Sequence, residues 1–205
     1  MNEGGRTDGA TPGDDESGLI PGSPTDRLAR NAVELEAIAN AYDKHLFRAR
    51  RKKRGDAWLT EAYVHQVHHD MFGSIWDWAG QYRRVQLNIG ILWHQIPEQV
   101  RLLLDDFRYW NSFDSSMPEL EIAARLQNRL TRIHLFKNGN GRHARLITDI
   151  FLYSRSHPLP NWPQIHLMEQ GNAVRERYLS AMRAGDKENF EPLIAFIQGC
   201  VPHSP

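Results

Sequence analysis

Apolar residues recur three and four positions apart along most of the chain, and this periodicity predicts a mainly helical domain. Thr25, Thr60 and Pro97 each precede such a periodic segment, and these residue types are favoured at helix N-termini. We expect each of the three helices to bury one apolar stripe. The expected stripes are Leu28, Ala32, Leu35, Ala39, Tyr42 and Leu46 in the first helix, Val64, Val67, Met71, Ile75 and Trp78 in the second, and Val100, Leu103, Leu104, Phe107 and Trp110 in the third.

Further helical segments are predicted in the second half of the chain. Ser116 and Glu119 have the spacing of a capping box, so a fourth helix should begin there. After a proline-containing loop over residues 156–164, two closing helices are expected. The stripes in this half are Ile122, Leu126, Leu130 and Ile133, then Ala144, Ile147 and Phe151, then Val174, Tyr178 and Met182, and finally Phe190, Leu193, Ile194 and Ile197.

One segment, from Tyr82 to Trp93, has a different period. Its apolar residues alternate with polar ones, which is the pattern of a half-buried strand, and Gly90 allows a turn before a short return strand. A hairpin alone would be marginally stable, so we expect it to pack on helices. The predicted fold class is therefore all-α, with one inserted β-hairpin.

The start of the chain has a different composition. Residues 1–24 are rich in Gly, Asp, Thr, Pro and Ser, and they contain almost no large apolar side chain before Leu19 and Ile20. Such a segment cannot offset the entropy of ordering by burial. We therefore predict a disordered tail over residues 1–24, with the patch from Leu19 to Pro21 able to dock, followed by one folded domain over residues 25–205.

The candidate chemistry lies between two predicted helices, in a polar stretch that ends at Arg145. His134, at the exit of the first helix, is suited to accepting a proton near neutral pH. Gly139 and Gly141 tolerate positive φ and give the backbone room, while a helix N-terminus attracts anions. Arg142 and Arg145 are three positions apart and so share a helical face. The stretch predicts a phosphate cradle with a base beside it.

This stretch resembles the signature of the Fic/Doc family, His-x-Phe-x-(Asp/Glu)-Gly-Asn-Gly-Arg-x-x-Arg. The similarity extends over most of the expected domain, roughly residues 20 to 199. The segments 78–83 and 93–97 resemble most closely the subgroup called mobile mystery protein B. The signature residues that match are His134, Phe136, Gly139, Asn140, Gly141, Arg142 and Arg145.

The resemblance implies a Fic-like fold and a protein adenylyltransferase that moves AMP from ATP to a hydroxyl side chain of a target protein. His134 would be the general base, and Phe136 would anchor the loop in the core. The amide of Asn140 would contact phosphate oxygens, and the hairpin would be the flap that holds the target. The implied phosphate-binding residues are Asn138, Gly139, Asn140, Gly141, Arg142 and Arg145, and the implied flap contacts are Ile89, Leu92 and Trp93.

Asn138 is the position at which the chain departs from the signature. The family has Asp or Glu there and uses it to bind Mg²⁺, whereas an asparagine oxygen brings no negative charge. Asn138 is therefore a doubtful metal ligand. Slower metal-dependent transfer, a metal-independent variant and a nucleotide-binding protein with little activity all stay open.

Other readings also stay open. The same fold could transfer UMP or a phosphate, or it could be a degenerate nucleotide-binding or regulatory module. Neither Glu-Gly nor Glu-Asn in this chain completes the family's inhibitory pattern Ser/Thr-x-x-x-Glu-Gly/Asn. The resemblance instead implies a small helix-turn-helix or antitoxin-like partner, as in a toxin–antitoxin pair.

Composition and charge limit the partners and the cellular location that we expect for this protein. The formal net charge is zero, so no global field recruits nucleic acid or a membrane. The basic run over residues 48–54 fits a solvated helix C-terminus better than a nucleic-acid site. A single cysteine, Cys200, excludes an internal disulfide framework. Without a signal-peptide pattern or a long apolar run, a cytoplasmic location is expected.

Overall fold

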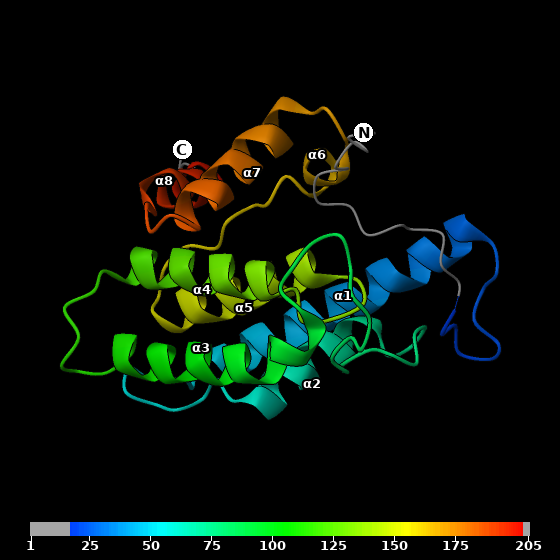
Figure 1. The fold of residues 1–205 in the computed structure, drawn as a ribbon, viewed down its shortest axis with the longest axis horizontal. Coiled ribbons are helices and arrows are strands. Elements are labelled where there is room, and N and C mark those ends of the chain that lie inside the picture. The colour runs from blue at the N-terminus through cyan, green and yellow to red at the C-terminus, as the bar shows by residue number, and fades with distance from the viewer. Residues whose placement is uncertain (1–16, 203–205) are drawn as a thin grey trace.

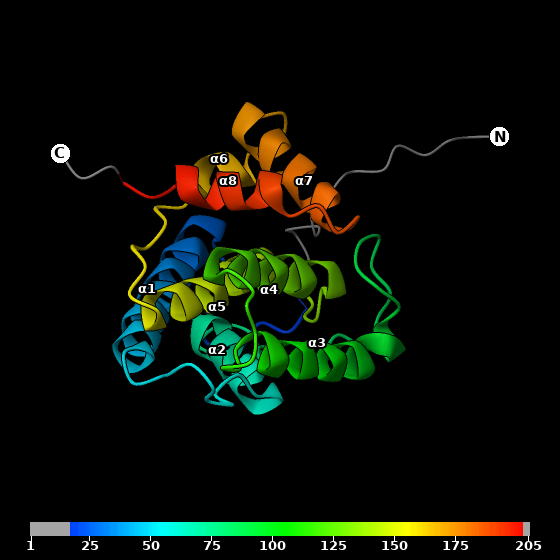
Figure 2. The ribbon, with the colours of Figure 1, turned by 90° about the vertical axis from the view of Figure 1, so that its left-hand side faces the viewer.

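The computed structural model describes residues 17–202, apart from the side chain of Met168. Within these residues the chain forms eight α-helices and one short 3₁₀ helix. Helices α1 to α5 pack into a bundle, and α6 to α8 lie together against one side of it (Figures 1 and 2). The helices are α1 (Arg27–Ala49), α2 (Glu61–Phe72), η1 (Trp93–Gln95), α3 (Ile96–Trp110), α4 (Glu119–Ile133), α5 (Asn140–Ser154), α6 (Gln164–Met168), α7 (Ala173–Gly185) and α8 (Glu191–Gly199).

The predicted helical architecture is confirmed. Thr60 caps α2 by accepting a hydrogen bond from the Tyr63 N–H, as its position suggested. Pro97 lies in the first turn of α3, where its missing N–H removes no helical hydrogen bond. Phe107 and Phe151 are fully buried and meet edge to face in the core. Within residues 17–202, no helix combines the length and the apolar character needed to cross a membrane.

The stripe predicted for the first helix is confirmed only in its second half, where Tyr42 and Leu46 pack against the core. Leu28 and Leu35 are 79% and 69% exposed, and the helix instead buries a more polar face. One reason is that polar contacts orient it: the buried His45 pairs with Asp70 of α2 at 2.9 Å. Apolar residues occur on several faces of α1, so periodicity alone could not select the inner one. The buried residues of α1 are Arg30, Ala41, His45 and Ala49.

The capping box predicted at Ser116 is also absent. Pro118 occupies the N-cap position of α4 in an extended conformation, with φ −59° and ψ 140°, and no side chain caps the helix. Because proline fixes φ and disfavours helical geometry in the residue before it, α4 begins only at Glu119. Ser116 therefore lies too far outside the helix to cap it.

The segment from 83 to 92 forms no strand, although its alternation predicted a hairpin. Figure 1 shows it as a long loop beside the C-terminal end of α4. The buried Arg83 side chain organises this loop by donating to the carbonyls of Val85 at 2.9 Å and Ile91 at 2.6 Å. It also donates to the carbonyl of His134 at 2.7 Å. One guanidinium thus holds the loop closed and supplies the bonds that a ladder would have made.

Part of the predicted tail is ordered against the domain. Leu19 forms an isolated antiparallel bridge with Trp76, and the Ile20 N–H donates to the Ile75 carbonyl at 2.9 Å. The apolar patch therefore docks, and residues 17–24 follow the surface of the domain. Residues 1–16, the rest of the predicted tail, lie outside the described residues.

The Arg83 contacts predict that the loop loses order when the guanidinium is replaced by a group that makes fewer hydrogen bonds. Arg83→Lys keeps the charge but cannot reach three carbonyls at once, and each lost bond to a charged donor is worth about 1.5–3 kcal/mol. We expect faster amide hydrogen exchange over residues 84–92 and a lower urea midpoint. Arg84→Lys, at the exposed neighbouring position, is the matched control. Unchanged exchange in Arg83→Lys would contradict this role.

Candidate active site

His134 ends helix α4 in a left-handed conformation, with φ 56° and ψ 64°. The side chain is only 8% exposed, and its Nε2 has no hydrogen-bond partner in the described protein. The imidazole bonds to the backbone of Thr131, so Nδ1 carries the proton and the lone pair of Nε2 is available. Burial, helped by the charge of Arg83, lowers the pKa of His134 to about 4. At neutral pH the side chain is therefore an uncharged acceptor.

The loop after His134 is clamped from within by Asn140. Its Oδ1 accepts from the Phe136 N–H at 2.9 Å, and its Nδ2 donates to the Phe136 carbonyl at 2.8 Å. Both polar atoms of this amide are thus committed to the backbone. The second hydrogen of Nδ2 is left for the expected contact with phosphate, which stays a prediction, and the N–H groups of the first turn of α5 are further local donors.

His68 of α2 fixes the same loop from the other side. Its Nε2 donates to the Asn138 carbonyl at 3.0 Å, and its Nδ1 accepts from the Gly80 N–H at 2.9 Å. The ring stacks on Phe136 with centroids 3.7 Å apart, so Phe136 is a core anchor as predicted. Burial holds the pKa of His68 well below its usual value, which keeps the imidazole neutral and maintains both hydrogen bonds.

Only one of the two signature glycines needs a left-handed backbone. Gly139 has φ +76°, and a Cβ there would lie 2.5 Å from the ring of Phe72. Gly141 lies inside the first turn of α5, where a Cβ would meet the Arg145 Nη1 at 3.5 Å, an ordinary contact. Gly139 therefore lets the loop close against α2, whereas Gly141 leaves space beside the N-terminus of α5.

The two signature arginines project from α5 with different partners. Arg145 is 5% exposed, donates to Gln164 Oε1 at 2.7 Å, and has a buried Nε without a partner in the described protein. Arg142 lies over the ring of Phe72 and pairs with Glu34 of α1 at 3.0 Å. Glu34 also accepts from the Trp76 indole N–H at 2.7 Å. A carboxylate therefore already occupies some of the N–H donors of the Arg142 guanidinium.

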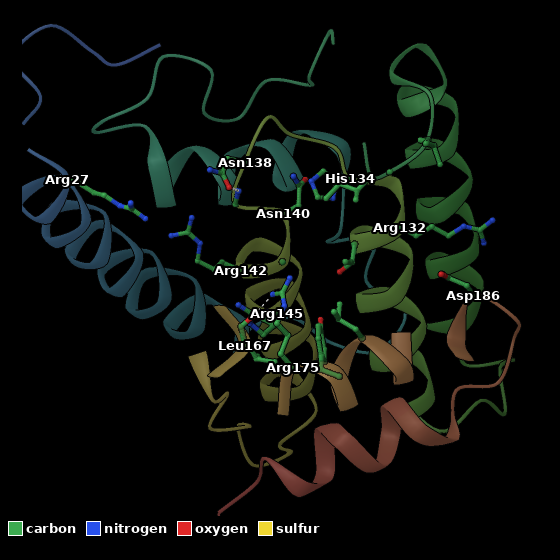
Figure 3. Close-up of a pocket in the computed structure, with 18 residues that line it drawn as sticks. Arg27, Arg132, His134, Asn138, Asn140, Arg142, Arg145, Leu167, Arg175 and Asp186 are labelled. Atoms are coloured by element: carbon green, nitrogen blue, oxygen red, sulfur yellow. Dashed lines mark hydrogen bonds between the residues drawn. The ribbon is translucent and has the colours of Figure 1, made fainter. Parts of the chain in front are cut away.

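These groups face one cavity of about 640 Å³, a size typical of small-molecule sites. Figure 3 shows His134, Asn138 and Asn140 at one side of it, with Arg142 and Arg145 beneath them. The loop closes over this side: Ile89 and Gly90 line the cavity, and a Cβ on Gly90 would lie 2.5 Å from the His134 Cβ. Leu92 and Trp93, the other expected flap residues, are outside the lining and are 48% and 43% exposed.

The sequence model of the Fic/DOC family matches residues 58–152, which run from the start of α2 into the end of α5 and contain the whole site loop. This part of the chain is similar to the Fic/DOC family. The proteins named Protein adenylyltransferase Fic from Drosophila grimshawi and Drosophila virilis are 30% and 28% identical to it over 124 residues. That alignment covers 60% of this chain and 24% of each relative, so the chain spans about a quarter of their length.

Solved structures agree on the fold. A Fic domain containing signaling protein from Bacteroides thetaiotaomicron has a TM-score of 0.66 at 20% identity and covers 82% of this chain and 67% of that one. BepC from Bartonella tribocorum, solved with bound AMPPNP, has a TM-score of 0.56 at 18% identity, over 91% of this chain and 97% of that one. The Fic-like fold is thereby confirmed, while the mobile mystery protein B subgroup stays a prediction.

Four residues of this site were missed by sequence reasoning: Arg83, His68, Glu34 and Arg27. Arg83 lies in a segment noted for its resemblance and His68 in the predicted second helix, yet nothing in the sequence showed that they bond to the site loop. Glu34 and Arg27 lie on α1, whose inner face was predicted wrongly in its first half. The packing of α1 against α5 brings Arg27 to the cavity and Glu34 to Arg142.

Glu34 competes with any anion that Arg142 could bind, so neutralising it should strengthen anion binding. Glu34→Gln keeps an acceptor for the Trp76 indole and removes the charge. We expect inorganic pyrophosphate to bind about threefold to tenfold more tightly by calorimetry, in line with the modest worth of a partly exposed ion pair. Glu36→Gln, an exposed glutamate on the same helix, should change nothing. Equal affinities in the two variants would show that Glu34 does not compete.

Proposed function

We propose that this Fic domain transfers AMP from ATP to a hydroxyl side chain of a target protein. The observation that carries the proposal is a pair of buried nitrogen atoms, Nε2 of His134 and Nε of Arg145, which have no partner in the described protein and belong to side chains lining one cavity. Buried polar groups are rarely left unpaired, and such exceptions mark binding sites. One is a proton acceptor and the other a cationic donor, as nucleotidyl transfer requires.

The donor fits the cavity in one orientation. Its phosphates belong at the start of α5, beside Arg142 and Arg145, where the helix dipole and free N–H groups also attract anions. The nucleoside would then extend toward Leu167 and Leu179, which supply apolar surface at the α6–α7 side of the cavity. Names of similar proteins support this choice, since relatives are called adenylyltransferases, and one Bartonella structure holds AMPPNP and another ADP.

The chemistry follows from the state of His134. The Nε2 lone pair takes the proton of the target hydroxyl while that oxygen attacks the α-phosphorus. The bond from the α-phosphorus to the bridging oxygen breaks, and pyrophosphate leaves with the electron pair. The products are the AMP-modified side chain, pyrophosphate and a protonated imidazole that returns its proton to solvent. Base assistance of this kind contributes about 10²–10⁴-fold, and positioning by the arginines must supply the rest.

We assign one surface to the target. It consists of the loop over residues 83–92, which ends at Leu92, and the adjoining Trp93. Val85 is 53% exposed, and with Leu92 and Trp93 it gives the loop an apolar outer side next to His134. Since Arg83 already occupies the carbonyls of Val85 and Ile91, the target would dock mainly on these side chains. Such a contact would bring a hydroxyl over the cavity mouth.

The proposal predicts that His134→Ala abolishes transfer and keeps nucleotide binding. We expect labelled AMP on the protein or on an added substrate protein, detected by intact mass, to fall at least 100-fold. His94→Ala, an exposed histidine near the loop, is the matched control and should retain activity. Binding in wild type and variant with transfer in neither would favour the nucleotide-binding module. Parallel reactions with UTP identify a UMP donor, and unchanged transfer by His134→Ala would refute its role as base.

The buried environment of His134 predicts an unusual titration. Its pKa of about 4 lies below the ordinary value of about 6.5, so the side chain should stay neutral from pH 8 to pH 5. NMR of the histidine rings, assigned by comparison with His134→Ala, measures this directly. A bound polyanion favours the imidazolium, so saturating pyrophosphate should move the midpoint upward. A midpoint near 6.5 in the free protein would contradict the burial argument.

A further inference from the structure

The residues around Asn138 do not fit the divalent cation that the family places there. The Oδ1 of Asn138 accepts from the Gly139 N–H at 2.7 Å, so this neutral oxygen already closes a turn within the loop. Mg²⁺ sites in proteins are built on carboxylates and substrate phosphates. Between residues 17 and 202, no three His, Cys, Asp or Glu side chains come together in a way that could hold a metal.

The carboxylate in the cavity lining is also unsuitable as a replacement ligand. Asp186 is the only carboxylate among the described residues that line the cavity. Figure 3 places it at the far end from Asn138, on the side of Arg132. Its Oδ1 accepts from the Asn128 amide at 3.2 Å, which ties it to α4. It therefore cannot share a metal with Asn138.

Cationic side chains are concentrated in the same cavity. Its lining contains five arginines against that single aspartate, and the arginines come from four helices. Figure 3 shows Arg27 reaching from α1 toward Arg142, at the Asn138 side of the cavity. The five are Arg27 on α1, Arg132 on α4, Arg142 and Arg145 on α5, and Arg175 on α7.

Arg27 is informative because its position is unfavourable for the helix that carries it. It is the first residue of α1, where the positive end of the dipole disfavours a cation, and no acidic residue lies in that turn. Arg27 nevertheless lines the cavity, where its charge would attract an anion. Its exposed side chain has the length to meet such an anion.

The carboxyl next to Arg145 on α5 offsets its positive charge only in part. The carboxyl nearest to it along α5 is Asp149, and burial raises the pKa of Asp149 to about 7. Near neutral pH this carboxyl is therefore only partly ionised. It also accepts from the Trp162 indole at 2.9 Å, and Arg145 donates to the neutral Gln164.

We propose that this domain binds its nucleotide as the metal-free polyphosphate, with the guanidinium groups of Arg27, Arg142 and Arg145 taking the place of the divalent cation. The inference rests on the proposed function and specifies the ionic form of its donor. Guanidinium groups bind phosphate oxygens in pairs and need no metal to do so. Mg²⁺ on the nucleotide removes two negative charges from the ligand and so weakens its attraction to this cavity.

The test is calorimetric titration of the full chain with ATP, once in excess EDTA and once in excess Mg²⁺. We expect ATP to bind in EDTA at least as tightly as in Mg²⁺. Asn138→Asp should reverse that order, because a carboxylate repels the bare phosphates and binds the metal, so its affinity in EDTA should fall about tenfold or more. Thermal melting checks that each variant is folded.

A second pair of variants tests the arginine directly. Arg27→Gln should weaken ATP binding in EDTA about threefold to tenfold, because one charge-assisted contact is lost. Arg48→Gln makes the same charge change on an exposed face of α1 outside the cavity, and it should have no effect. Equal losses of ATP affinity in both variants would show that Arg27 acts only through the overall charge of the protein. That result would overturn its assigned role.

The outcomes separate the two proposals. Wild-type binding that requires Mg²⁺ would overturn this inference and leave the transferase proposal intact. Failure to bind ATP under either condition would refute the proposed function and, with it, the inference. Binding in EDTA that Asn138→Asp abolishes and Mg²⁺ restores would support both.

Discussion

The candidate site depends on the way in which one amide closes the turn between α4 and α5. Asn140 bonds through both of its polar atoms to the backbone of Phe136, four residues earlier. This holds His134 at the end of one helix and the free N–H groups of the next helix on the same side of the loop. His68 then pins the loop to α2 through the Asn138 carbonyl. An internal clamp of this kind is needed because the loop has almost no regular hydrogen bonding of its own.

A second constraint fixes the loop over residues 83–92 to the end of α4. Arg83 bonds to the carbonyl of His134 and to two carbonyls of the loop that passes over it. The guanidinium is therefore a structural partner of the base as well as a nearby positive charge. By both routes it favours the neutral imidazole: it orders the cover that buries the ring, and its charge lowers the pKa of His134. Loop order and proton affinity at the site are thus coupled through one side chain.

The comparison of sequence with structure shows which features local pattern can determine. The cap at Thr60, the place of Pro97 in the first turn of α3 and the burial of Val64, Val67 and Met71 depend on neighbouring residues, and these predictions are confirmed. The inner face of α1 and the conformation of the segment expected to form strands depend on contacts formed across the fold. Alternation of apolar residues near Val85 resembles a strand, but an arginine side chain satisfies the carbonyls instead. The signature located the site, whereas Glu34 and Arg27 reached it only through helix packing.

The departure at Asn138 has consequences because charge in this cavity is supplied from several helices. A site that relies on one carboxylate and one metal loses most of its phosphate affinity when the carboxylate becomes an amide. Here arginines on α1, α4, α5 and α7 supply the positive charge of the cavity. The Asn138 amide can therefore close a turn within the loop while the cavity keeps its positive charge. Burial and the charge of Arg83 disfavour a protonated His134 in the free protein. Neutral His134 and the guanidinium cluster are therefore mutually consistent: the cluster holds the anion, and the anion in turn raises the basicity that His134 needs when a proton must be taken.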